Sequence, residues 1–316
     1  MHASAANPIS DLIERQGYMV LDGGMATTLE ARGFDLDDEL WSAKLLLESP
    51  EAIRQVHLDF LAAGADCIIT ASYQASLPGF RKRDLSDAVG SDLLRLSVDL
   101  ACEARDLFWR KGEGRGKRFK PLVAASIGPY GAYLADGSEY TGDYRISDYQ
   151  LYDFHLGRWQ VLAASEADLL ACETIPSGCE SAVLLQLLND TPDCHAWMSF
   201  SCKDGLHLCD GTPLQEMVRL CDGEQKVAAI GINCTAPEHI SSLVIKAREY
   251  TDKMIIVYPN LGESYDAITK TWGSGSSVKD WLDSTHEWFR LGALGIGGCC
   301  RIGPETIRDL RRLLLG

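Results

Sequence analysis

The chain alternates short apolar runs with longer segments of helical periodicity from one end to the other. The apolar runs are rich in Val, Ile, Leu and Ala and show little polar alternation, which is typical of parallel strands buried on both faces. Strands are predicted over residues 18–22, 67–71, 122–127, 168–173, 195–200, 227–233, 254–258 and 293–297. The pattern therefore predicts an α/β fold.

The segments between these strands carry helix start and stop signals. Ser49 and Pro50 mark the start of one helix and Gly64 its end, and another helix begins at Pro304. Successive strand–helix units favour a closed (β/α)8 TIM barrel over an open doubly wound sheet. No G-x-G-x-x-G motif follows the first strand, which agrees with this choice. We expect a single barrel domain over residues 1–316, since such barrels typically span about 250 residues or more.

Composition narrows the range of partners. The 316 residues carry a net charge of −15, which argues against a nucleic-acid or anionic membrane partner. No apolar run is long enough to span a membrane, and residues 1–10 do not resemble a targeting segment. The 11 cysteines are scattered among apolar segments, as expected in a reducing compartment. We therefore expect a cytoplasmic protein, and its oligomeric state stays open.

Three cysteines are candidate metal ligands. Cys234 follows one predicted strand, and Cys299 and Cys300 follow the last one. Adjacent strand residues face opposite sides, so two neighbouring cysteines that act together must lie on a loop beyond the strand. Parallel strands bring such loops to the same end of a barrel. Three thiolates leave one position of a tetrahedral Zn²⁺ open, which is typical of a catalytic site.

Other interpretations of these segments remain open at this stage. The three cysteines would also fit a buried apolar core. The Gly297–Gly298 turn would fit a phosphate site, although that leaves the cysteines unexplained. Cys202, His207 and Cys209 form a second candidate metal cluster, but they lack a further ligand and lie in a glycine-containing loop. We favour the site at Cys234, Cys299 and Cys300.

Further candidate binding residues lie at the ends of predicted strands. Asp22, just before Gly23, and Glu173 are placed to hold an ammonium group, or else to stabilise loop backbone by hydrogen bonding. Asn233 directly precedes Cys234 and would also fit a turn cap. Trp41 and Tyr73 would suit either a core or a cationic ligand, because aromatic rings attract alkylated cations.

Several motifs together resemble the homocysteine S-methyltransferase family. They occupy residues 21–27, 70–76, 126–132, 171–174, 210–214, 231–234 and 297–300. The resemblance covers nearly the whole chain. It implies a (β/α)8 barrel in which Cys234, Cys299 and Cys300 bind Zn²⁺ and the sulfur of L-homocysteine takes the open position.

The resemblance also implies roles for the remaining candidates. Asp22 and Glu173 are expected to hold the homocysteine amino group, with help from backbone near Gly23 and the side chain of Asn233. Trp41 and Tyr73 match positions near the methyl donor.

The family divides by methyl donor, and this chain resembles the branch that uses S-methylmethionine. The segment 128–144 matches that branch, and Thr174 stands where the betaine branch has a tyrosine. We expect a sulfonium donor, S-methylmethionine or also S-adenosylmethionine. A betaine-dependent enzyme and a non-catalytic zinc- or thiol-binding barrel remain the alternatives. If metal is lost, Cys299 or Cys300 is expected to pair with Cys234 by oxidation.

Overall fold

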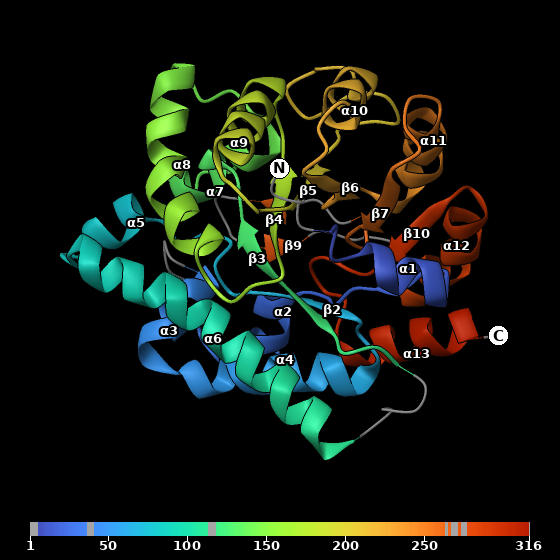
Figure 1. Ribbon diagram of the computed structural model, residues 1–316, viewed down its shortest axis with the longest axis horizontal. Helices are drawn as coiled ribbons and strands as arrows, with labels where there is room; N and C mark the ends of the chain where they lie inside the picture. The colour runs from blue at the N-terminus through green and yellow to red at the C-terminus, as the bar shows by residue number, and fades with distance from the viewer. Residues whose placement is uncertain are drawn as a thin grey trace.

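A computed structural model describes residues 6–36, 41–112, 118–262, 265–266, 271–272 and 277–315 of the chain. Of residues 41, 42, 265, 266, 271 and 272 only the backbone is described. Figure 1 shows helices packed around a central set of strands.

The centre of the molecule is an eight-stranded parallel barrel. Its strands are β1 (Met19–Val20), β2 (Cys67–Ile69), β3 (Leu122–Ile127), β4 (Leu169–Ile175), β5 (Ala196–Phe200), β6 (Val227–Asn233), β7 (Met254–Tyr258) and β10 (Ala293–Ile296). The sheet order is β1-β10-β7-β6-β5-β4-β3-β2. A single parallel bridge between Leu21 and Cys67 joins the two edges, so the barrel is nearly closed. The predicted (β/α)8 barrel is confirmed.

The predicted strands agree closely with the observed ones in the middle of the sheet and less well where β1 meets β2. The predicted bounds of β3, β6 and β7 are correct. The first strand is shorter than predicted because its backbone pairs regularly only at Met19 and Val20. Beyond these residues Leu21 forms one bridge, and the chain then turns at Asp22. By contrast, β4 runs two residues past its predicted end at Glu173, to Ile175.

Helices surround the barrel along the whole chain. They are α1 (Ser10–Gln16), α2 (Met25–Glu30), α3 (Leu45–Glu48), α4 (Pro50–Ala63), α5 (Leu77–Arg81), α6 (Asp87–Lys111), α7 (Tyr130–Leu134), α8 (Asp148–Ala163), α9 (Gly178–Asp190), α10 (Leu214–Asp222), α11 (Pro237–Arg248), α12 (Val278–Arg290) and α13 (Pro304–Leu315). Two 3-10 helices, η1 (Trp41–Lys44) and η2 (Ser138–Tyr140), lie in loops. Among the described helices, none is long and apolar enough to cross a membrane.

The helix bounds follow the predicted signals. Helix α4 starts at Pro50 and is followed by Gly64, whose φ of 125° suits a residue without a side chain. Ser49 occupies the N-cap position but forms no capping hydrogen bond through its side chain. Helix α13 starts at Pro304, as predicted.

The core has two layers. One fills the barrel interior, where Leu12 of α1 joins Trp197, Ile256 and other strand residues. Helix α1 therefore packs against one end of the barrel interior. The larger layer lies between the strands and the surrounding helices. With the interior filled by side chains, the loops after the strands are left to form a site at the opposite end.

Candidate active site

The three predicted cysteines come together at the carboxyl ends of the strands. Cys234 directly follows β6, and Cys299 and Cys300 lie in the loop after β10. Their sulfur atoms all lie within 4.8 Å of one another. Cys300 is buried, whereas Cys234 and Cys299 are half-buried. No other such group of His, Cys, Asp or Glu side chains occurs among the described residues.

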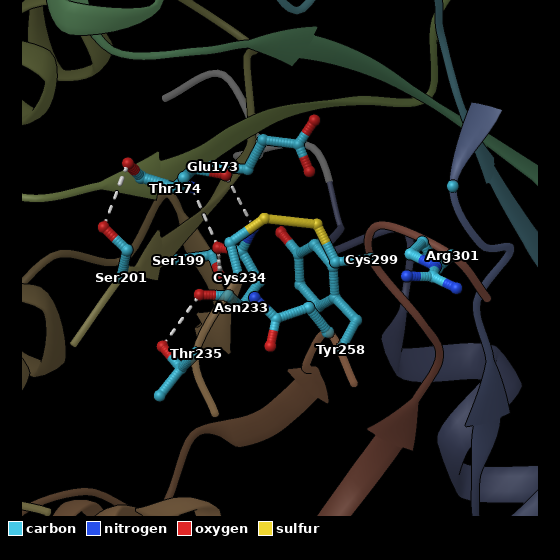
Figure 2. Close-up of a disulfide and its surroundings, with 12 residues drawn as sticks. Glu173, Thr174, Ser199, Ser201, Asn233, Cys234, Thr235, Tyr258, Cys299 and Arg301 are labelled. Atoms are coloured by element: carbon cyan, nitrogen blue, oxygen red, sulfur yellow. Dashed lines mark hydrogen bonds between the residues drawn. A yellow bond between two sulfur atoms is a disulfide. The ribbon is translucent and has the colours of Figure 1, made fainter. Parts of the chain in front are cut away.

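A disulfide joins Cys234 to Cys299, and Cys300 takes no part in it. Figure 2 shows this bond beside Asn233 and Tyr258. The pairing is one of the two that the sequence predicts for the metal-free state.

The three sulfurs could hold a metal ion once the disulfide is reduced. Zinc–sulfur bonds of about 2.3 Å in a tetrahedron place sulfurs about 3.8 Å apart. The three sulfurs already lie within 4.8 Å of one another, so breaking the Cys234–Cys299 bond would leave them near that spacing. Metal binding requires thiolates, so the disulfide and a metal held by all three sulfurs exclude each other. The cluster therefore has two chemical states available, one oxidised and one able to bind metal.

The glycines before Cys299 allow the loop to pack tightly against the first strand. A Cβ atom on Gly297 would lie 2.5 Å from the Cβ of Leu21, and one on Gly298 would lie 2.2 Å from the Cβ of Ile302. The N–H groups of Gly297 and Gly298 donate to the carbonyls of Val257 and Asp22, both at 3.0 Å. Because both donors are occupied, this turn does not offer the phosphate cradle considered above.

Two buried carboxylates, Asp22 and Glu173, lie at the same end of the barrel. Asp22 is 2 % exposed and Glu173 is 7 % exposed. Asp22 Oδ2 accepts from the backbone N–H of Ile69 at 2.8 Å. Among the described residues, no lysine or arginine forms an ion pair with either carboxylate. They are thus placed to accept a cation from outside the chain.

Burial changes the ionisation of both groups. Loss of water raises the pKa of Asp22 well above its ordinary value, and the nearby charge of Glu173 raises it further. Burial raises the pKa of Glu173 to about 7, although hydrogen bonds from Ser126 and Tyr258 oppose this. A bound ammonium group would lower both pKa values by stabilising the ionised forms.

The side chain of Asn233 is engaged mainly by the protein itself. It is 1 % exposed. Its Oδ1 accepts from the N–H of Thr174 at 2.8 Å and from the hydroxyl of Ser199 at 2.7 Å. Its Nδ2 donates to Thr174 Oγ1 at 2.7 Å. Among the described residues, the second N–H of the amide has no partner.

The remaining predicted site residues are Gly23, Tyr73 and Trp41. A Cβ on Gly23 would lie 2.1 Å from the carbonyl oxygen of Ile302, so only glycine fits there. Tyr73 is half-buried, and its ring lies against Gly128 after β3. The backbone of Trp41 lies in η1, but its side chain is outside the described part of the chain.

The other predicted cluster does not assemble. His207 Nδ1 lies 3.1 Å from both carboxylate oxygens of Asp204, and Cys209 Sγ lies 3.5 Å from the hydroxyl of Ser201. Cys202 is buried, which raises the pKa of its thiol well above the ordinary value. The side chains of His207 and Cys209 thus hydrogen-bond to neighbouring protein residues and do not converge on a metal site.

Comparison with known proteins identifies the family. Residues 19–314 match the family model described as homocysteine S-methyltransferase. The chain belongs to this family. It is 52 % identical over 304 residues to homocysteine S-methyltransferase YbgG of Bacillus subtilis, covering 96 % of each chain. The family assignment makes the protein a methyltransferase enzyme.

Two solved structures of the homocysteine methyltransferase MmuM from Escherichia coli share the fold. The metallated form gives a TM-score of 0.87 at 44 % identity and covers 96 % of this chain and 99 % of that one. The oxidized form gives 0.88 at 45 % identity, with coverage of 97 % and 99 %. The family thus includes a relative solved in both a metal-bound and an oxidised state.

Sequence reasoning missed the hydrogen-bonding partners of the site residues. Ser126 donates to Glu173, Tyr258 lies beside the same carboxylate, and Ser199 donates to Asn233. A signal was present, since Ser126 and Ser199 are polar residues within apolar strands. A buried polar residue in such a strand needs a partner, and a site residue on the next strand can supply one.

Proposed function

We propose that this methyltransferase moves a methyl group from S-methylmethionine to the thiolate of L-homocysteine, and that it uses zinc. The gathering of the Cys234, Cys299 and Cys300 sulfurs within 4.8 Å is the observation that carries the proposal. The homocysteine sulfur forms the new S–CH3 bond. The sulfonium S–CH3 bond breaks and its electron pair stays on the departing sulfur. Both products are methionine, and the thiol proton of homocysteine is released.

The three cysteines would hold the metal as thiolates. When bound, zinc supplies a Lewis acid with a fourth position for the substrate sulfur, which keeps that sulfur ionised near pH 7. Free thiols have a pKa near 8.5, so without such help most of the homocysteine would be protonated. Cys300, being buried, would form the base of the site, and Cys234 and Cys299 its more open side.

The carboxylates of Asp22 and Glu173 would bind the homocysteine ammonium group. Both are buried and lack a cationic partner among the described side chains, so an incoming ammonium group compensates their charge. Ser126 and Tyr258 orient Glu173 for this contact. The leftover N–H of Asn233 and the backbone near Gly23 would help to fix the amino acid.

Tyr73 would face the methyl donor, and Trp41 is proposed as a second donor-binding residue. An aromatic ring attracts a sulfonium cation, and this attraction weakens as the methyl leaves and the donor becomes neutral. S-Adenosylmethionine carries the same cationic group and would serve as a slower donor. Thr174 in place of the tyrosine of the betaine branch supports a sulfonium donor over betaine.

We also propose a cytoplasmic location. Apart from Cys234 and Cys299, no described cysteine forms a disulfide. Cysteines that form no disulfide, in this number, suit a reducing compartment.

The test compares metal content and methionine formation in wild type, Cys234→Ala and Cys179→Ala, each purified with reductant. Cys179 is an exposed cysteine on α9 and serves as the matched control. Wild type and the control are expected to hold about one zinc per chain and to form methionine from homocysteine and S-methylmethionine, whereas Cys234→Ala loses both.

Each donor is then supplied alone at equal concentration. Turnover with betaine only would overturn the proposed donor. Zinc binding without methionine formation from any donor would leave a zinc-binding barrel with no transferase activity.

A further inference from the structure

Three buried polar side chains that the proposed mechanism does not use lie between α8 and α9. They are His155 and Arg158 of α8 and Glu180 of α9, each at most 1 % exposed. Charged side chains are rarely buried this deeply without specific partners. These three, the α8–α9 array, form hydrogen bonds with one another and with the segment that follows β3.

The chemistry of the side chains fixes the directions of the hydrogen bonds within the array. Arg158 can only donate, so its Nη2, at 2.7 Å from Nδ1 of His155, makes Nδ1 an acceptor. The ring proton is then on Nε2, which donates to Oε1 of Glu180 at 2.8 Å. Burial and the charge of Arg158 lower the pKa of His155 to about 4, so the ring is neutral near pH 7. A neutral imidazole thus bridges the guanidinium and the carboxylate.

The array also binds the backbone of the turn after β3. Nη2 of Arg158 donates to the carbonyl oxygen of Gly128. Oε1 of Glu180 accepts from the N–H of Tyr130 at 2.6 Å. Gly128 directly follows β3, and Tyr130 is the first residue of α7. The turn over residues 128–130 is therefore held at both ends by side chains from two outer helices.

The same turn contacts Tyr73 in the loop after β2. The N–H of Gly128 donates to the carbonyl of Tyr73 at 3.2 Å. A Cβ atom on Gly128 would lie 2.7 Å from two ring carbons of Tyr73, so the ring packs directly on the backbone of the turn. The next residue, Gln74, donates from Nε2 to the carbonyl of Ala132 in α7 at 2.9 Å. The position of the Tyr73 ring thus depends on the position of the turn.

We propose that Arg158, His155 and Glu180 are positioning residues for the methyl donor: they hold the turn over residues 128–130, and the turn sets the ring of Tyr73. This inference rests on the proposed methyl transfer, in which Tyr73 faces the donor. The array acts through the backbone of the turn and not by contact with a substrate.

The consequence for catalysis is geometric. In-line transfer requires the acceptor sulfur, the methyl carbon and the leaving sulfur to be aligned, and a displacement of about 1 Å can cost about a hundredfold in rate. A buried turn held by hydrogen bonds resists displacement, because moving it would leave buried polar atoms without partners. Cys234, Cys299 and Asp22 follow other strands, β6, β10 and β1. Loss of the array should therefore affect the donor and spare zinc and homocysteine.

The main test variant combines Arg158→Met with Glu180→Met. Removing both charges avoids leaving one of them buried alone, which is the more damaging change to a fold. Methionine keeps roughly the length of both side chains but lacks their strong donors and acceptors. The matched control is Glu180→Gln, whose amide oxygen can still accept from Tyr130 and His155. Steady-state rates are measured with S-methylmethionine and homocysteine varied separately, along with zinc content and melting temperature.

The double methionine variant is expected to lower kcat/KM for S-methylmethionine at least about tenfold. Its homocysteine KM and zinc content should stay close to wild type. Glu180→Gln should keep most of the rate, within about threefold of wild type, because its hydrogen bonds remain. If the array acts through Tyr73, adding Tyr73→Ala to the double methionine variant should give an enzyme little worse than Tyr73→Ala alone.

Gly128→Ala tests the contact with Tyr73 and leaves the array itself unchanged. The added methyl group would lie 2.6 Å from the carbonyl oxygen of Tyr73 and 2.7 Å from its ring, so the two segments must move apart. The same donor-specific loss is expected. This variant decides the question even if the double methionine variant does not fold.

Four results would overturn the inference: wild-type donor kinetics in either folded variant, equal losses in Glu180→Gln and the double methionine variant, losses that add to those of Tyr73→Ala, or an equal rise in the homocysteine KM. A wild-type enzyme that forms no methionine refutes the proposed function instead. An active wild type with unaffected variants refutes only the positioning role.

Discussion

The two ends of the barrel treat buried carboxylates in opposite ways. At the amino ends of the strands, Asp66 precedes β2 and lies 2.6 Å from Nη1 of Arg311. It also accepts from Gln16 at 2.7 Å and from the N–H of Val20 at 3.0 Å. Even the more exposed Asp168, which precedes β4, pairs with Arg105 at 3.1 Å. The chain supplies the cations for these acids.

At the carboxyl ends, Asp22 and Glu173 are buried like Asp66, but among the described residues they have no such partner. Hydrogen bonds from Ser126 and from the N–H of Ile69 orient them, but no described basic side chain balances their charge. An unpaired buried charge costs stability, and a fold retains it where a ligand compensates the charge. The amino end thus contributes to stability, whereas the carboxyl end fits the binding role proposed for Asp22 and Glu173.

The largest expected effect is at the amino end. Asp66→Asn would leave the buried Arg311 and the half-buried Arg118 without their carboxylate, which costs about 3–5 kcal/mol of folding free energy. Urea unfolding measures this loss, with Asp11→Asn as a control because the Asp11–Arg15 pair on α1 is exposed. Methyl transfer per folded molecule should not change. A stable Asp66→Asn protein with impaired catalysis would contradict the division between the two ends.

Glu173→Gln should increase the stability of the fold at alkaline pH, whereas Asp66→Asn decreases it. The folded pKa of Glu173, about 7, lies above its ordinary value of 4.5. Native Glu173 therefore holds its proton while the unfolded chain loses it, so the free energy of unfolding falls between these pH values and stays lower above pH 7. Glutamine removes this cost. The reduced, metal-free variant should be more stable than wild type by about 3 kcal/mol at pH 8.

Near pH 4 the two proteins should be equally stable, since Glu173 is protonated in both states. The same variant should raise the homocysteine KM, because the ammonium group loses one carboxylate. Unfolding curves at both pH values and homocysteine titrations provide the measurements. Lower stability of Glu173→Gln at pH 8 would show that Glu173 has a stabilising partner after all.

Some features of the barrel and of its carboxyl end can be predicted from the sequence. The barrel and the cysteine cluster are predictable because they depend on order along the chain: each strand end is followed by its own site residue, and the sheet brings those ends together. Cys234, Cys299 and Glu173 all lie where their strand positions predict.

The supporting contacts are harder to predict because they join strands that are distant in sequence. Nothing local in Thr174 indicates its φ of 59° or its two hydrogen bonds with Asn233 in β6. The length of β1 is likewise decided by its neighbours, since regular pairing with β10 involves only Met19 and Val20. Such features follow from register between strands, which the hydrophobic pattern alone does not specify.

The smallest expected effect is in the loop after β5, where Cys202, His207 and Cys209 resemble metal ligands in sequence only. The combined variant His207→Ala with Cys209→Ser should keep the zinc content of wild type and its rate within about twofold, since surface changes of this kind usually alter stability by about 0.5 kcal/mol or less. His207 is bound to Asp204 and Cys209 to Ser201, so neither side chain is available to a metal. Loss of zinc in this variant would mean that the loop supplies a ligand. Retention would show that a place at the carboxyl end of a strand is insufficient for metal binding, and that the sulfurs must also converge, as they do at Cys234, Cys299 and Cys300.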